Sequence, residues 1–233
     1  MKYTTLLFDA DNTLFDFDAA EASSLRAVCK SLDVEMNRQV FNLYHHINKK
    51  CWVDFEKGKL PQEEIQITRF SRFLNRLESN ADPIEIGNQY LSGLAKSETL
   101  IEGSVEMLKR LKSMEFELVV ITNGLKQVQR AHFEHTGLTE YFSEIIVSDE
   151  IGVSKPHKAF FDYTFEKINQ KNKSKVLIIG DGLSSDIKGG MNYGVDTLWF
   201  NKRGIELPKG YKPTYQMDRL EEIFGILDGK VNC

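Results

Sequence analysis

The 233-residue sequence has few of the residues that mark disulfide-rich, fibrous or membrane-spanning proteins. It has only 5 prolines and 3 cysteines, and it shows no low-complexity tract or fixed-period repeat. Cys29, Cys51 and Cys233 form no CxxC pair, which argues against a disulfide framework or a zinc site and fits a reducing compartment. No apolar run is long enough for a signal-peptide core or a membrane span. We therefore expect a cytoplasmic protein without a membrane partner.

An excess of positive charge is also missing. Lys and Arg number 30 against 34 Asp and Glu, which gives a net charge of −4, and there is no basic run. A protein that binds a nucleic-acid polymer needs a positive surface, so that class of partner is disfavoured. A small anionic ligand stays compatible with this charge, because a bound metal or a few placed lysines can supply positive charge locally.

What the sequence does contain is an alternation of two patterns. Short apolar runs rich in β-branched residues predict buried strands at residues 3–8, 117–122, 144–148, 175–180 and 195–200. Segments with a helical spacing of apolar residues lie between them. Because parallel strands need crossover connections, the alternation predicts an α/β fold with a parallel sheet and helices on both faces.

The segment between the first two predicted strands is too long for one crossover. It carries only helical patterns, at residues 20–32, 40–56, 63–77 and 84–94, and Pro61 and Pro83 stand where helix starts are expected. We interpret residues 16–97 as an inserted α-helical cap and residues 1–15 and 98–233 as the core. An insert that leaves the carboxyl end of a strand is well placed to cover a ligand there. Alternatively, these helices pad one face of the sheet.

Polar residues follow the predicted strands at their carboxyl ends, where ligands bind in folds of this kind. Clustered carboxylates repel one another, so four of them at one edge predict a bound cation, and oxygen ligands without His or Cys favour Mg²⁺. A lysine and a threonine hydroxyl beside that cation describe a pocket for a phosphoryl group. The residues are Asp9, Asp11, Thr122, Asn123, Lys155, Asp181 and Asp186.

The Asp9-x-Asp11 spacing allows a division of labour. Asp9, kept ionised by Mg²⁺ and Lys155, suits in-line attack on phosphorus. Asp11 would then protonate the leaving oxygen and later take a proton from the attacking water. Each signal alone has an ordinary explanation as a turn, a helix cap or a solvated lysine. Their occurrence in order at successive strand ends favours the catalytic interpretation.

These motifs carry a family resemblance. The segments DADNTL, TNG, KP and GDGLSSD resemble the four signature motifs of the haloacid dehalogenase-like (HAD) phosphatase superfamily. The resemblance covers the whole chain and implies a Rossmann-like core, a helical cap inserted after the first motif and an aspartyl-phosphate mechanism with Mg²⁺.

The resemblance also assigns roles to individual residues. It implies that Asp9 is the nucleophile and that Asp11 is the acid/base, whose backbone carbonyl also binds the metal. It implies further that Thr122 and Lys155 bind phosphate, that Asp181 is a direct Mg²⁺ ligand, and that Asp186 holds a metal-bound water. Asn123 is expected to lend its backbone NH to phosphate or only to cap the following helix.

Longer segments are similar to one branch of the superfamily, the YjjG-type pyrimidine 5′-nucleotidases. These segments are LLFDADNTLFDFD, WVDFEKGKL, ITNGLKQVQRAHFEHTGLTEYF, SDEIGVSKPHKAFFDY and IGDGLSSDIKGGMNYGVDTLWFN. The resemblance implies a nucleoside monophosphate as substrate. Two alternatives stay open: a phosphatase acting on sugar phosphates or other small metabolites, because the cap selects the substrate, and a receiver-type signalling protein that accepts a phosphoryl group on aspartate. The sequence does not indicate an oligomeric state.

Overall fold

The structure is a computed structural model that describes residues 2–229, apart from the side chain of Glu56. The chain forms two compact units, one made of Met1–Asp16 and Glu98–Cys233 and the other of Phe17–Ser97. Cys29 and Cys51 are buried and free, and Cys233 lies outside the described residues. In the described range no helix has the length and apolar character needed to cross a membrane.

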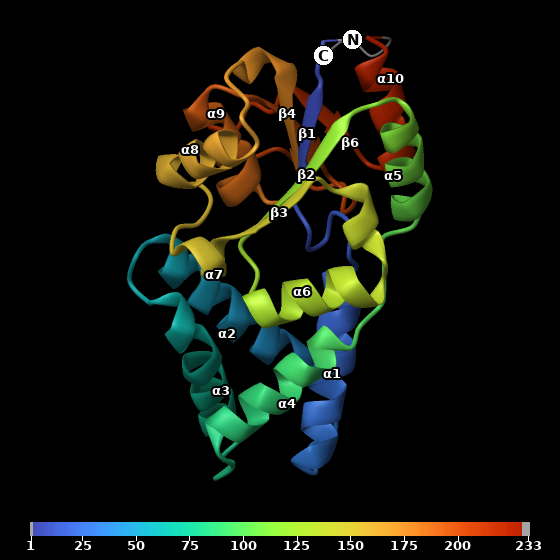
Figure 1. Cartoon of the computed structure of the whole chain (residues 1–233). Coiled ribbons are helices and arrows are strands. Elements are labelled where there is room, and N and C mark those ends of the chain that lie inside the picture. Colours follow the sequence, from blue (N-terminus) through green and yellow to red (C-terminus); the bar gives the residue numbers. More distant parts are fainter. Residues whose placement is uncertain (1, 230–233) are drawn as a thin grey trace. The chain divides into compact units, whose positions relative to one another are not determined.

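The first unit contains a parallel sheet of six strands in the order β3-β2-β1-β4-β5-β6 (Figure 1). The chain adds strands to one side of β1 and then crosses to the other, so the switch in direction lies between β1 and β4. This arrangement confirms the predicted α/β class and the five predicted strands. They are β1 (Thr5–Phe8), β2 (Glu117–Thr122), β3 (Glu144–Val147), β4 (Val176–Gly180) and β5 (Asp196–Phe200).

A sixth strand, β6 (Tyr215–Met217), was not predicted. It pairs with β5 at the edge of the sheet. Only Met217 of its three residues is buried, so this strand lacks the apolar run that marks the others. An edge strand this short gives no period-two signal in the sequence.

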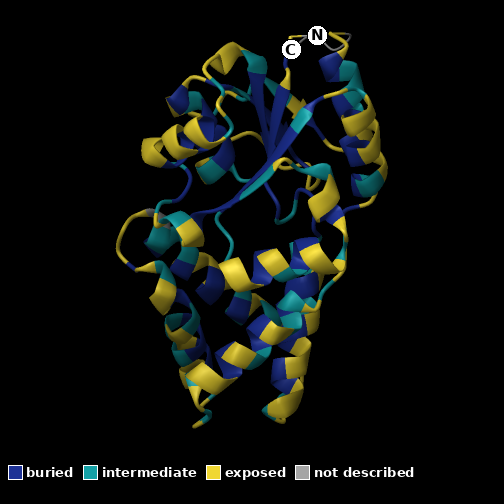
Figure 2. Cartoon of the chain, in the orientation of Figure 1, coloured by how far each residue is buried: buried dark blue, intermediate teal, exposed yellow. Residues whose placement is uncertain are grey.

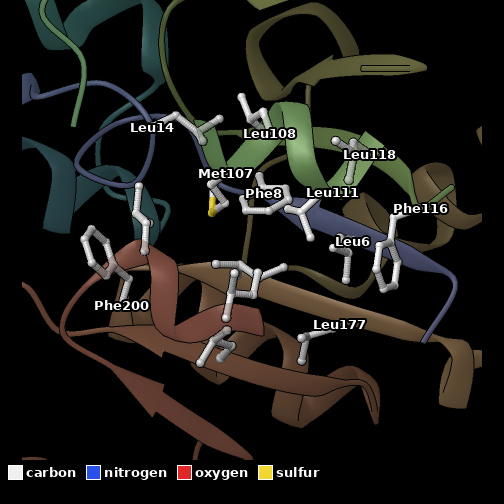
Figure 3. Packing of buried hydrophobic residues seen from close by; sticks show 14 of the residues in the cluster. Leu6, Phe8, Leu14, Met107, Leu108, Leu111, Phe116, Leu118, Leu177 and Phe200 are labelled. Carbon is white, nitrogen blue, oxygen red and sulfur yellow. The ribbon is translucent and has the colours of Figure 1, made fainter. Parts of the chain in front are cut away.

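Helices cover both faces of the sheet. Side chains alternate between the two faces along a strand, so each strand contributes apolar residues to both. Leu6 and Phe8 of β1 belong to one hydrophobic cluster (Figure 3), and Leu7 between them belongs to another. The first cluster includes residues of α5 (Ser104–Ser113), α6 (Lys126–His135) and α10 (Ile223–Leu227); the second includes residues of α8 (Lys158–Lys167) and α9 (Lys188–Tyr193).

Strands β1, β2, β4 and β5 are almost entirely buried (Figure 2), as expected for parallel strands with both faces covered. Short helical segments complete the connections. They are the α-helical turn α7 (Ser148–Ile151), the 3₁₀ segments η2 (Leu138–Tyr141), η3 (Lys173–Lys175) and η5 (Leu220–Glu222), and the π-helical segment η4 (Leu183–Ile187).

The second unit is entirely helical, as its sequence pattern predicted. Asp82 caps α4 by accepting a 2.9 Å hydrogen bond from the Ile84 backbone NH, and Pro83 occupies the first turn. Pro61 precedes a short 3₁₀ turn instead of an α-helix. The elements are α1 (Phe17–Ser31), α2 (Arg38–Glu56), η1 (Gln62–Glu64), α3 (Ile65–Arg76) and α4 (Pro83–Ala95).

An aromatic core holds α2, α3 and α4 together. Tyr44 lies 5.6 Å from Phe70, 5.3 Å from Phe73 and 5.4 Å from Tyr90 between ring centroids. All four rings are fully buried, and ring pairs at such distances add to the stabilisation from area burial. The role of this unit as a substrate cap stays a prediction.

Candidate active site

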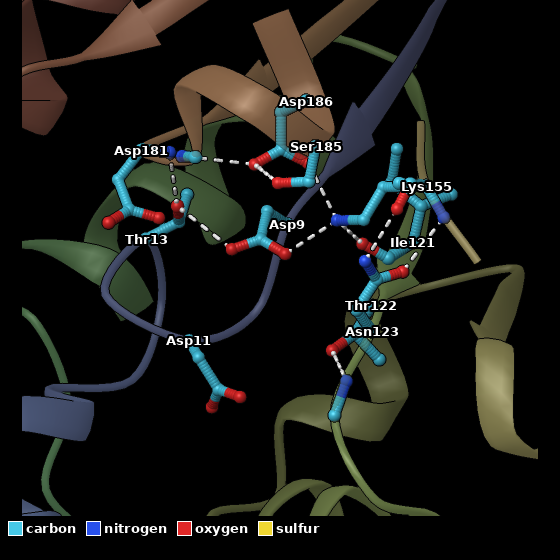
Figure 4. A network of polar contacts seen from close by, with 12 residues as sticks. Asp9, Asp11, Thr13, Ile121, Thr122, Asn123, Lys155, Asp181, Ser185 and Asp186 are labelled. Carbon is cyan, nitrogen blue, oxygen red and sulfur yellow. Dashed lines mark hydrogen bonds and ion pairs between the residues drawn. The ribbon is translucent and has the colours of Figure 1, made fainter. Parts of the chain in front are cut away.

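Asp9 stands directly after β1, at the switch point of the sheet (Figure 4). Its backbone NH donates a 2.8 Å hydrogen bond to the Ile179 carbonyl, which continues the pairing with β4 one residue past the strand. The residue is only 8% exposed. The backbone pairing of β1 with β4 therefore holds Asp9 at the edge of the sheet.

A buried lysine links the ends of three strands. The Lys155 Nζ donates hydrogen bonds of 2.7 Å to Asp9 Oδ1, 2.6 Å to Asp186 Oδ1 and 2.6 Å to the Ile121 carbonyl. Burial by itself lowers the pKa of this amine, but Asp186 and Asp9 outweigh that effect and hold the pKa above its ordinary value. Lys155 is therefore a fixed positive charge with all three of its protons donated.

Asp186 is held by the turn that follows β4. Its Oδ2 accepts hydrogen bonds from the Gly182 NH at 3.1 Å and from the Ser185 hydroxyl at 3.3 Å. A Cβ at Gly180 or Gly182 would lie 2.5 or 2.6 Å from the same oxygen. The two glycines of the GDG motif thus leave the space that the Asp186 carboxylate occupies. Burial, only partly offset by Lys155, raises the pKa of Asp186 to about 7.

Asp181 completes a group of three carboxylates. One oxygen each from Asp9, Asp181 and Asp186 lies within 4.8 Å of the others. The Asp181 backbone NH donates to the Thr13 hydroxyl at 3.2 Å, and its carbonyl accepts a 3.1 Å hydrogen bond from Trp199 Nε1. Burial, followed by repulsion from Asp9 and Asp186, raises the pKa of Asp181 well above its ordinary range.

This group fits a divalent cation. One lysine ammonium cannot neutralise three carboxylates, and repulsion among the carboxylates adds to burial in raising the pKa values of Asp181 and Asp186. All three side chains offer hard oxygen ligands, which suit Mg²⁺ better than zinc.

Asp11 lies outside this group, although it is only two residues from Asp9. The chain turns directly after it, because Asn12 adopts a left-handed conformation with a φ of 60°. Asp11 Oδ2 accepts a 2.8 Å hydrogen bond from Gln129 Nε2, whereas its Oδ1 is buried and makes no hydrogen bond to any described residue. Burial, reinforced by Asp9, raises the pKa of Asp11 to about 7. The two carboxylates therefore have different partners, a cation for Asp9 and an amide for Asp11.

The TNG segment after β2 supports the lysine. Asn123 Nδ2 donates to the Lys155 carbonyl at 2.8 Å, and Asn123 Oδ1 accepts from the Lys155 NH at 2.9 Å. Thr122 is buried, and its hydroxyl oxygen accepts a 3.0 Å hydrogen bond from the Gly124 NH. In this structure the Asn123 side chain fixes the Lys155 backbone, and the predicted contacts of Thr122 and Asn123 with phosphate stay predictions.

Three residues of this network were not predicted. Thr13 donates to Asp9 Oδ2 at 3.4 Å while its oxygen accepts from the Asp181 NH. Thr13 lies within the first motif, so its spacing from Asp9 could have singled it out. Ser185 lies within the GDGLSSD segment and Gln129 five residues after the TNG segment, but the contacts that they make form only in the folded chain.

The chain matches known proteins over nearly its full length. The family model of haloacid dehalogenase-like hydrolases matches residues 6–200. The pyrimidine 5′-nucleotidase YjjG of Escherichia coli is 34% identical over 227 residues, which cover 97% of this chain and 99% of YjjG. The pyrimidine 5′-nucleotidase PynA of Streptococcus pneumoniae is 32% identical over 231 residues, which cover 99% and 98%.

A solved structure agrees with this similarity. The structure of the HAD-hydrolase designated YfnB of Bacillus subtilis, solved with bound magnesium, superposes with a TM-score of 0.91 at 37% identity and covers 98% of this chain and 100% of YfnB. The sheet order, the carboxylates at the strand ends and the match over residues 6–200 agree with one another. The chain belongs to the haloacid dehalogenase-like hydrolase family.

Proposed function

We propose that this protein is a Mg²⁺-dependent phosphatase that hydrolyses nucleoside 5′-monophosphates through a phosphoryl group carried on Asp9. The observation that carries the proposal is the pairing of Asp9 with the buried Lys155 amine at 2.7 Å, inside a group of three carboxylates. The Lys155 amine balances part of the negative charge of this group, and the Asp9 carboxylate at its centre is an oxygen nucleophile of the kind that attacks phosphorus.

We propose that Asp9, Asp181 and Asp186 hold the Mg²⁺, Asp186 acting through a bound water. When bound, the ion would polarise the phosphoryl oxygens and offset the charge of the carboxylates. We propose further that the backbone carbonyl of Asp11 binds the same ion.

In the first half of the reaction, an Asp9 carboxylate oxygen forms a bond to phosphorus while the ester oxygen leaves. Asp11 gives its proton to that oxygen, so the product is a neutral alcohol. In the second half, ionised Asp11 takes a proton from water, whose oxygen attacks phosphorus. The Asp9–phosphorus bond breaks, inorganic phosphate is released, and Asp11 is protonated again. The amide partner of Asp11 suits a group that must change protonation state, because an adjacent cation would keep it ionised.

The nucleotide preference rests on the relatives. Both YjjG and PynA are named pyrimidine 5′-nucleotidases, and their matches cover 97% and 99% of this chain, so they extend into residues 17–97. We propose that this helical unit is the cap that selects the substrate. A phosphatase for sugar phosphates is the second candidate, because that choice depends on the cap and not on the carboxylates.

A panel of substrates tests the proposal. Purified protein with Mg²⁺ is expected to release phosphate from UMP, dUMP and dTMP faster than from sugar phosphates such as ribose 5-phosphate, and EDTA should abolish the release. Faster turnover of the sugar phosphates would refute the nucleotidase assignment but keep the phosphatase. No release from any ester, with a phosphoprotein stable for minutes, would favour a receiver instead.

A further inference from the structure

Gln129 is the side chain that holds the Asp11 carboxylate. It lies on α6, five residues after the TNG segment, and is only 1% exposed. Its Nε2 donates to Asp11 Oδ2 at 2.8 Å, and its Oε1 is buried without a hydrogen bond to any described residue. The one hydrogen bond described for this amide therefore goes to the proposed acid/base, Asp11.

The space for this contact depends on Gly124 of the TNG segment. A Cβ at Gly124 would lie 2.3 Å from Gln129 Nε2 and 2.8 Å from Gln129 Cδ. Gly124 is not among the glycines with a positive φ, so the backbone itself would accept an alanine. Glycine is needed here because the space that a Cβ would take is filled by Gln129.

We infer that Gln129 is a positioning residue that fixes the Asp11 carboxylate for proton transfer, and that Gly124 is glycine because Gln129 passes over it. This inference rests on the proposed phosphatase function and deepens it. With Oδ2 bound to the amide, Asp11 is left with Oδ1, which has no described partner, for exchange with the leaving oxygen or water. Misplacing a reacting group by about 1 Å can cost about 100-fold in rate.

Two substrates distinguish positioning from a general structural role. The leaving group of UMP is the 5′-alkoxide of uridine, which needs a proton, whereas that of p-nitrophenyl phosphate is a stable phenolate, which needs little assistance. With Mg²⁺, Gln129→Leu is expected to lower kcat/KM for UMP by about 10- to 100-fold. The same change should lower kcat/KM for p-nitrophenyl phosphate by less than about 3-fold. The value of kcat/KM reports only the steps up to phosphoryl transfer, and in these steps the phenolate needs little protonation.

Two controls test whether the loss of kcat/KM in Gln129→Leu acts through Asp11. Gln127→Leu alters an exposed glutamine on the same helix and should leave both ratios unchanged. In an Asp11→Ala background, Gln129→Leu should produce no further loss for UMP, because its effect passes through Asp11. Equal losses for both substrates, or a full additional loss without Asp11, would overturn the inference.

A second cycle tests the packing of Gly124 against Gln129 by urea unfolding as well as by turnover. Gly124→Ala should displace the flexible Gln129 side chain, lower kcat/KM for UMP as Gln129→Leu does, and shift the urea midpoint. In a Gln129→Ala background the added methyl group should be accommodated, so the shift should vanish. An equal shift in both backgrounds would overturn the role of Gly124. A wild-type protein that hydrolyses neither ester would instead refute the proposed function, while the urea cycle would still report on the packing.

Discussion

Replacing Lys155 with Met removes the charge at the centre of the carboxylate group. The variant leaves Asp9 and Asp186, which are 8% and 1% exposed, and the Ile121 carbonyl without the amine that now binds all three. Breaking a buried ion pair by removing one partner costs about 3–5 kcal/mol. Because the pKa of Asp186 is already raised to about 7, protonation relieves part of this cost near neutral pH. We therefore expect the free energy of unfolding to fall by an amount near the lower end of this range, about 3 kcal/mol in the absence of metal.

Urea unfolding followed by circular dichroism measures this loss. Lys158→Met is the matched control, because Lys158 pairs with Asp162 on the surface, where both side chains are largely exposed, and such pairs contribute about 0–1 kcal/mol. The pKa values of Asp181 and Asp186 are raised in the folded protein, and loss of the Lys155 charge raises them further, so the stability of the variant falls as pH rises through that window. The deficit relative to wild type should therefore be larger at pH 8 than at pH 5.5. A deficit below about 1 kcal/mol at pH 8, equal to that of the control, would refute the buried ion-pair account.

Other changes probe the separate roles in the site. Asp9→Asn should abolish phosphate release while the circular dichroism spectrum is preserved, and activity near wild type would exclude Asp9 as the nucleophile. Asp11→Asn should slow turnover by about 10²- to 10⁴-fold and let phosphoenzyme accumulate in rapid-quench experiments; an unchanged rate would contradict its acid/base role. Asp181→Asn should weaken Mg²⁺ binding in isothermal calorimetry, and unchanged affinity would remove it from the metal site. Gly182→Ala crowds Asp186 Oδ2, which lies 2.6 Å from the added Cβ, and should weaken Mg²⁺ binding by about 10- to 100-fold. An unaltered affinity would show that the turn can move.

The parts of the fold that the sequence predicted are those with a strong repeating signal. The buried strands are continuous apolar runs, and the helices of residues 17–97 have apolar positions at helical spacing, so the bounds of both were predicted to within about three residues. β6 was missed because only Met217 is buried in it, and its pairing depends on β5 being in place.

The site divides in a similar way. The positions of Asp9 and Asp181 follow from strand ends, since parallel strands bring their carboxyl ends to one edge, and Lys155 lies in the loop after β3 that leads away from the same edge. The hydrogen-bond partner of Asp11 does not follow from any local pattern, because Gln129 lies 118 positions away in the chain. Likewise, the Asn123 side chain was not expected to fix Lys155, because that contact joins two loops whose meeting depends on sheet order.

The central claim is that Asp9 carries the phosphoryl group during turnover. The most direct measurement is to quench the protein during turnover of UMP with Mg²⁺, treat it with borohydride, which reduces an acyl phosphate to an alcohol, and locate the change by peptide mass spectrometry. We expect position 9 to be reduced only when substrate and Mg²⁺ are both present, with more product in an Asp11→Asn variant. Reduction at another residue, or phosphate release with position 9 never modified, would contradict the account.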